Sequence, residues 1–119
     1  MRNSSPIHWI RAALGGIFAE IGVFIVVFSV RAALGQTAFL VSILVASAFL
    51  PLLLALWVCR KVKSQFVFHG TLVGTVAALT YLALAWGQPE PMLYKIAHGL
   101  KLAGGAAGGF LASRSTPRA

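Results

Sequence analysis

Acidic side chains are almost absent from this sequence, which has two glutamates, Glu20 and Glu90, no aspartate, and ten Lys or Arg residues. The sequence shows no carboxylate pair arranged for acid–base catalysis, no Ser/His/Asp arrangement and no phosphate-binding loop followed by lysine. Its only cysteine, Cys59, excludes a disulfide within the chain and a metal cage built from cysteines. We predict that the protein is not an enzyme and carries no metal or other cofactor.

Charged residues are scarce altogether, at 10% of the chain, while hydrophobic residues make up 59%. Soluble domains carry about 25% charged residues. Most basic residues stand at the ends of apolar runs, where they anchor helices among anionic lipid headgroups rather than bind nucleic acid. With 119 residues, the chain is long enough for one domain. We therefore expect a single transmembrane domain over residues 1–119, with the lipid bilayer as its partner and no nucleic acid.

Four apolar runs have about the 20 residues that a helix needs to cross a bilayer. They cover roughly residues 10–31, 37–59, 66–86 and 92–112. The fourth is the weakest because it contains Lys95, His98 and Lys101, and the alternative is an amphipathic helix on the membrane surface. Short connections indicate antiparallel neighbours. The predicted fold class is all-α, a four-helix bundle in the membrane, followed by a basic, flexible tail at residues 113–119.

The distribution of basic residues predicts the orientation, because Lys and Arg are enriched on the cytoplasmic side. With four spans, one side of the membrane holds the larger group: Arg2, Arg11, Arg60, Lys61, Lys63, Arg114 and Arg118. The other side holds Arg31 and Lys95. We therefore expect a multi-pass protein of the inner (plasma) membrane with both termini in the cytoplasm.

Small residues at helical spacing indicate where the helices meet, because membrane helices associate through close backbone approach. Such glycines occur in the first, third and fourth runs: Gly15, Gly16, Gly70, Gly74, Gly104, Gly105, Gly108 and Gly109. The last four form two interleaved GxxxG patterns. We expect these faces to join helices of the same chain, and a homodimer seam is the alternative.

Glu20 and Lys101 each stand within an apolar run. A charge at the centre of a bilayer costs at least ~2.5–3.5 kcal/mol on insertion scales, so it calls for a partner or a function. At ~1.5 Å per residue, both lie at similar depth. We expect the first and last helices to be adjacent and these two residues to form an ion pair.

Two histidines, His69 and His98, each precede a glycine within an apolar run. An imidazole in such a place either hydrogen-bonds another helix or ligates a haem or a pigment from one side. We keep both interpretations open.

Two resemblances bear on function. The segment Leu14-Gly15-Gly16-Ile17-Phe18-Ala19-Glu20-Ile21-Gly22 and the tail Ser113-Arg114-Ser115-Thr116-Pro117 resemble parts of the small multidrug resistance transporters. That resemblance implies that Glu20 exchanges protons for cationic drugs. The HGTLVG and GGAAGG helices resemble those of uncharacterised small bacterial four-span membrane proteins, which implies a fold but no activity.

Three functions follow as hypotheses. The first is a structural or accessory subunit of the membrane, held together by glycine packing and a Glu20–Lys101 pair, alone, as a homo-oligomer or in a larger membrane complex. The second is a proton-coupled transporter of small cations that uses Glu20. The third is a membrane subunit that binds haem or pigment through His69 or His98.

Overall fold

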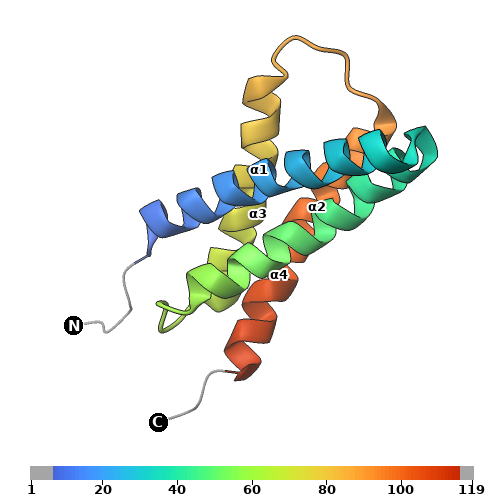
Figure 1. Ribbon diagram of the computed structural model, residues 1–119. Coiled ribbons are helices and arrows are strands. Elements are labelled where there is room, and N and C mark those ends of the chain that lie inside the picture. Colours follow the sequence, from blue (N-terminus) through green and yellow to red (C-terminus); the bar gives the residue numbers. More distant parts are fainter. Residues whose placement is uncertain (1–6, 116–119) are drawn as a thin grey trace.

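The computed structural model describes residues 7–115, which form four helices and no strand (Figure 1). The helices are α1 (Trp9–Leu34), α2 (Gln36–Cys59), α3 (Phe66–Leu84) and α4 (Met92–Ser115). The predicted all-α class with four helices is confirmed. Only Gly35 separates α1 from α2, and its φ of 93° lies in the region that glycine adopts without steric cost.

The end of α4 differs from the expectation. The helix continues to Ser115, so residues 113–115 are helical and are not part of a flexible tail. The remainder of the predicted tail, residues 116–119, lies outside the described residues, as do Arg2 and the rest of residues 1–6. Helix propensity explains the extension, because nothing in the Leu-Ala-Ser-Arg-Ser segment interrupts a helix before Pro117.

Three helices, α1, α2 and α3, are long and apolar enough to cross a membrane. Helix α4 is not among them, and it contains Lys95 and Lys101. It nevertheless packs along α2 and α3, and its inward face is buried at Ala97, Lys101, Gly104, Gly105, Gly108, Gly109 and Ala112. Helix α4 therefore belongs to the bundle.

The four helices do not form a closed square. Helices α2 and α3 contact each other and both of the remaining helices, whereas no Cα atom of α1 lies within 8 Å of one in α4. The expectation that the first and last helices are adjacent is wrong. The reason is the glycines of α4, which bring that helix against α2 and α3 and leave α1 on the opposite side of them.

Both glycine registers of α4 lie against helices of the same chain. A Cβ atom added to Gly105 or Gly109 would overlap the backbone of α3 at Gly70 or Phe66. The other register, Gly104 and Gly108, faces backbone atoms of α2 at Ala48 and Leu52. On α1, Gly15 and Gly16 lie against side chains of α2 and α3, namely Val58, Val73 and Val76. Only glycine allows helices to come this close.

Polar groups tie the helices together at the end of the bundle that holds the start of α1. The Arg11 guanidinium donates to the carbonyl oxygens of Trp57 and Val58, at 2.6 and 3.0 Å, and lies 3.9 Å from the centre of the Trp57 ring. These carbonyls belong to the last turn of α2, whose carbonyl groups lack partners within the helix. Arg11 therefore anchors α1 to α2.

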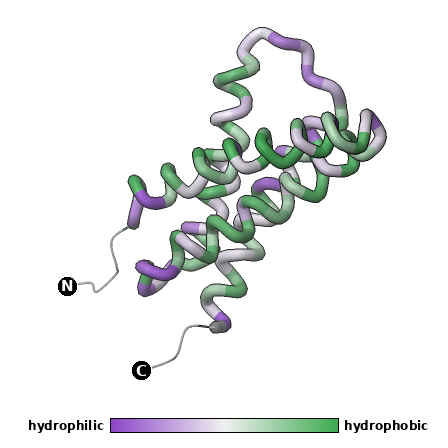
Figure 2. Tube along the Cα trace, in the orientation of Figure 1, coloured by the Kyte–Doolittle hydropathy of each residue, from purple (hydrophilic) through white to green (hydrophobic). Residues whose placement is uncertain are grey.

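The opposite end of the bundle is more open. There the C-terminal part of α3 diverges from the other helices, and the link formed by residues 85–91 returns the chain to α4 (Figure 1). Figure 2 shows hydrophilic residues in this link and near helix ends, whereas the helices carry long hydrophobic stretches. Large apolar side chains such as Ile25, Val41 and Leu79 are more than half exposed, as on a surface that faces lipid.

Candidate functional site

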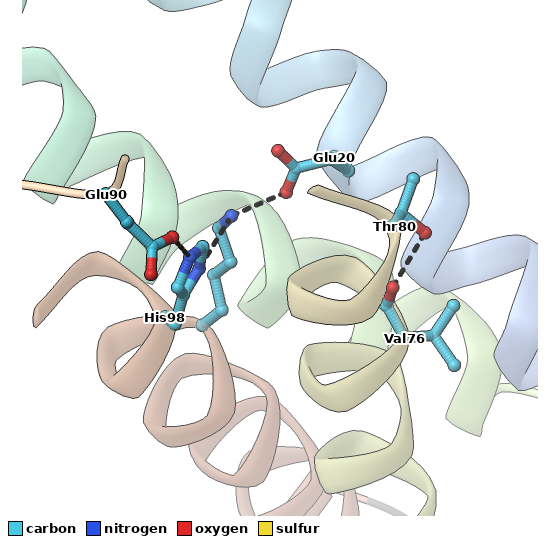
Figure 3. Close-up of polar contacts among 6 residues, drawn as sticks. Glu20, Val76, Thr80, Glu90 and His98 are labelled. Atoms are coloured by element: carbon cyan, nitrogen blue, oxygen red, sulfur yellow. Dashed lines mark hydrogen bonds and ion pairs between the residues drawn. The ribbon is translucent and has the colours of Figure 1, made fainter. Parts of the chain in front are cut away.

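The structure brings Glu20 of α1 and Lys101 of α4 together inside the bundle. The Lys101 Nζ atom lies 2.7 Å from Glu20 Oε1, and the two residues are only 1% and 2% exposed. Because the backbones of α1 and α4 are not neighbours, the long lysine side chain spans the distance between them. Figure 3 shows Glu20 on α1 facing this contact.

The ion pair lines a cavity of about 140 Å³. Four lining residues are polar or charged: Glu20, Ser47, His98 and Lys101. Five are aromatic: Phe24, Phe28, Phe39, Tyr81 and Tyr94. The others are aliphatic: Val23, Val27, Ile43 and Ala97. An apolar cavity of roughly 150 Å³ accommodates a benzene-sized molecule, so a small organic ligand fits this space.

Aromatic rings form a continuous wall around this cavity. The ring of Phe28 lies 5.8 Å from that of Phe39 and 6.1 Å from that of Phe24. Tyr81 then links Phe24 to Tyr94, at 6.2 and 5.8 Å between ring centres. The Lys101 ammonium lies 5.1 Å from the Tyr81 ring centre, within the distance at which a ring face attracts a cation. The wall thus already accommodates one positive charge.

Two polar atoms in the cavity have spare hydrogen-bonding capacity. Ser47 Oγ is buried and has no hydrogen-bond partner among the described residues. Glu20 Oε1 is likewise buried, and within the part of the chain that the structure describes it meets the Lys101 ammonium in an ion pair without a well-aligned hydrogen bond. Buried polar groups in native proteins usually have partners. The cavity therefore presents a hydroxyl and a carboxylate that a ligand can use.

A chain of polar contacts leads from the ion pair to the link between α3 and α4 (Figure 3). The His98 Nδ1 atom lies 3.4 Å from Lys101 Nζ, and its Nε2 atom lies 2.5 Å from Glu90 Oε2. An ammonium can only donate, so Nδ1 accepts and Nε2 carries the hydrogen that goes to Glu90. The side chains of His98 and Glu90 are 15% and 19% exposed. The chain thus connects the buried pair with the surface.

The second histidine singled out from the sequence, His69, lies in a different place. It is 1% exposed and sits near the start of α1. Its Nε2 atom accepts the His8 backbone N–H at 3.1 Å, and its Nδ1–H donates to the Gln65 carbonyl at 2.8 Å. All four ring nitrogens of His69 and His98 therefore have partners. A haem or pigment could be ligated only after one of these contacts breaks.

Several residues of the site carry little signal in the sequence. Tyr94, His98 and Lys101 follow one another at helical spacing, so the sequence alone indicates that they share one face of a helix. Tyr81, Ser47 and the aromatic residues of α1 enter the cavity only through packing between helices, which no local pattern encodes. Within the described residues, no group of three or more His, Cys, Asp or Glu side chains could hold a metal ion.

Comparison with protein-family models, with curated proteins and with solved structures found no match for this chain. The site itself therefore carries the functional argument.

Proposed function

We propose that this chain is a multi-pass membrane protein that binds a small organic cation in the cavity and exchanges it for a proton. The carrying observation is the buried carboxylate of Glu20, which faces an aromatic-walled cavity of about 140 Å³. Aromatic faces attract organic ammonium ions, and the attraction grows when water is excluded. A carboxylate at the end of such a wall complements the charge of the cation.

Lys101 defines how binding is coupled to protons. A second cation beside Glu20 would lie near the Lys101 ammonium, and two unit charges 4 Å apart repel by about 4 kcal/mol at an effective dielectric constant of 20. The repulsion disappears if Lys101 loses its proton. Uptake of one cation with release of one proton leaves the charge of the site unchanged, so no additional net charge is buried.

The bundle is suited to admit a ligand from one end. The lining residues extend from Glu20, in the middle of α1, to Phe28 and Tyr94 near the open end, and the glycine contacts close the opposite end. With both termini in the cytoplasm, the open end faces away from it. Release on the cytoplasmic side then requires a second conformation in which the glycine-packed end opens.

Calorimetric titration of detergent-purified protein with tetramethylammonium tests cation binding, because this probe is about the size of benzene and fits the cavity, is permanently charged and carries no proton to lose. We expect the wild-type protein to bind it. The double variant E20Q/K101M removes both buried charges at once, since neutral replacement of a buried ion pair is tolerated far better than loss of one partner. We expect this variant to fold, by circular dichroism, and not to bind.

The single variant K101M tests the proposal through the direction in which cation affinity changes. If Lys101 occupies the place of the cation, its removal frees the Glu20 carboxylate, and binding tightens by about tenfold or more, which corresponds to ~1.4 kcal/mol. Unchanged or weaker binding by a folded K101M protein would contradict the proposal.

A second candidate, a structural or accessory subunit, is supported by the ion pair being complete within the chain. Here the two charges serve only to fix α1 and α4 around α2 and α3. Neither the wild-type protein nor K101M then binds cations, and K101M loses stability because Glu20 stays buried and unpaired. A native size larger than one chain in detergent, by analytical ultracentrifugation, would favour a role in a homo-oligomer or a larger complex.

A further inference from the structure

We infer that His98 and Glu90 form the proton route through which Lys101 gives up its proton when a cation enters the cavity. This inference rests on the proposed function and extends it, because it assigns the route to two residues that do not contact the Glu20 carboxylate. The contacts join the residues in order: Glu20 to Lys101 at 2.7 Å, Lys101 to His98 at 3.4 Å and His98 to Glu90 at 2.5 Å.

Exposure increases in the same order. The side chains of Glu20 and Lys101 are 1% and 3% exposed, whereas those of His98 and Glu90 reach 15% and 19%. A proton leaving Lys101 through His98 therefore moves toward solvent at each step. Through the polar contacts of Lys101 shown by the structure, it can otherwise pass only to Glu20, which would remove the negative charge that binds the cation.

The transfer balances without any further reactant. The Lys101 ammonium donates its proton to His98 Nδ1, and the proton on His98 Nε2 passes to the Glu90 carboxylate. Lys101 becomes a neutral amine, Glu90 becomes a carboxylic acid, and His98 stays neutral as its other tautomer. Glu90 then releases the proton to water. When the cation leaves again through the open end, the same steps in reverse recharge Lys101 and restore the first tautomer.

The surroundings of His98 suit an imidazole that exchanges protons. From α3, the Tyr81 ring lies 5.0 Å from the His98 ring. Tyr94 and Lys101 line the same cavity from α4, Glu20 faces it from α1, and Glu90 approaches from the link. Imidazole passes protons efficiently because one nitrogen can accept while the other donates. Tyr81 packs against the ring and holds its plane between Lys101 and Glu90.

Another explanation is that the His98–Glu90 contact merely fastens the link to α4. The variant E90Q separates the two roles, since a glutamine oxygen can still accept the His98 Nε2–H but cannot take up a proton. H98Q also retains hydrogen bonding and removes proton transfer through the ring. A fastening role alone predicts that these variants change stability or affinity without delaying proton release.

The test mixes detergent-purified protein with tetramethylammonium in weakly buffered solution. A soluble pH indicator reports proton release, and intrinsic protein fluorescence reports binding, both by stopped flow. For wild type we expect release to keep pace with binding. For H98Q we expect release to slow by at least about tenfold, as when a positioned acid–base group is lost. E90Q should slow it less, because water reaches this position. Added imidazole should restore fast release in H98A.

Cation binding and the proton route can fail separately in this test. If the wild-type protein binds no cation, both are overturned. If it binds and releases a proton, but release in folded H98Q and E90Q keeps the wild-type rate, the route is overturned and the cation site stands. Delayed release in E90Q with unchanged affinity and melting temperature supports the route, even if H98Q fails to fold.

Discussion

At the scale of single residues, both ring nitrogens of His69 are used in hydrogen bonds that stabilise the fold. The first N–H groups of a helix have no partner within it, and the backbone N–H of His8 comes just before α1. His69 supplies an acceptor for that group from α3 at 3.1 Å. It thereby fixes the start of α1 against α3 and leaves no nitrogen for a ligand.

We predict that His69→Phe, which keeps a ring of similar size, lowers the free energy of unfolding by about 1–3 kcal/mol. The part-buried His8 N–H loses its acceptor, and the Gln65 carbonyl keeps only the backbone N–H of residue 69 as a donor. Thermal unfolding in detergent measures the effect. The matched control is His8→Ala. The contact uses the backbone of His8, so this change should stay within about 0.5 kcal/mol. An equal loss in both variants would show that the rings, rather than the hydrogen bond, hold the two helices together.

The sequence made Glu20 and Lys101 conspicuous because a charge within an apolar run stands out locally. It could not show the surroundings that give the pair its chemistry. Ser47, Tyr81 and the phenylalanines of α1 are ordinary residues in apolar helices, and only the angles between the helices turn them toward one cavity. Glu90 lies in the link between α3 and α4, so no helical spacing in the sequence relates it to His98.

At the scale of the helices, apolar length and glycine spacing made the four elements and their approximate limits predictable. The spatial order of the helices was not. It depends on which face of α4 meets which neighbour, and the two glycine registers lie on adjoining faces of that helix. One register meets α3 and the other meets α2, so α1 is excluded from α4.

Two glycines of the bundle provide a matched comparison. At Gly74, on α3, an added Cβ atom would overlap the backbone of Lys101 and Leu102. At Gly99, on α4, an added Cβ atom would meet no other atom within 4 Å. We predict that Gly74→Ala destabilises the protein by about 1–3 kcal/mol, as overpacking does. Gly99→Ala should stabilise it by about 0.5–1 kcal/mol, because alanine favours a helix. Thermal unfolding of the two variants checks both signs.

Gly74→Ala should also weaken cation binding, since separation of α3 and α4 moves the cavity's Tyr81 ring, on α3, away from Tyr94, on α4. Gly99→Ala should leave binding unchanged. If Gly74→Ala is as stable as wild type, the close approach of α3 and α4 at this position would be refuted.

At the scale of the whole molecule, the bundle has one tightly packed end and one open end. The packed end gathers Arg11, Arg60, Lys61, Lys63 and Arg114. The open end has Arg31, Lys95 and the acidic Glu90. Two residues of the original charge count, Arg2 and Arg118, lie outside the described residues, and the asymmetry persists without them. The charge pattern and the packing thus distinguish the same two ends.

This asymmetry predicts the orientation in the membrane, because the side richer in Lys and Arg stays in the cytoplasm. Single cysteines at the exposed positions Lys61 and Gln88, one near each end of the bundle, make it measurable. The native Cys59 is replaced by serine, which can still donate to the Phe66 carbonyl that the thiol contacts at 3.6 Å. In intact cells, or in spheroplasts where an outer membrane blocks access, an impermeant maleimide should label Q88C directly and K61C only after the membrane is opened. The reverse pattern would place the cavity mouth on the cytoplasmic side, and the exchange would then load its cation from within the cell.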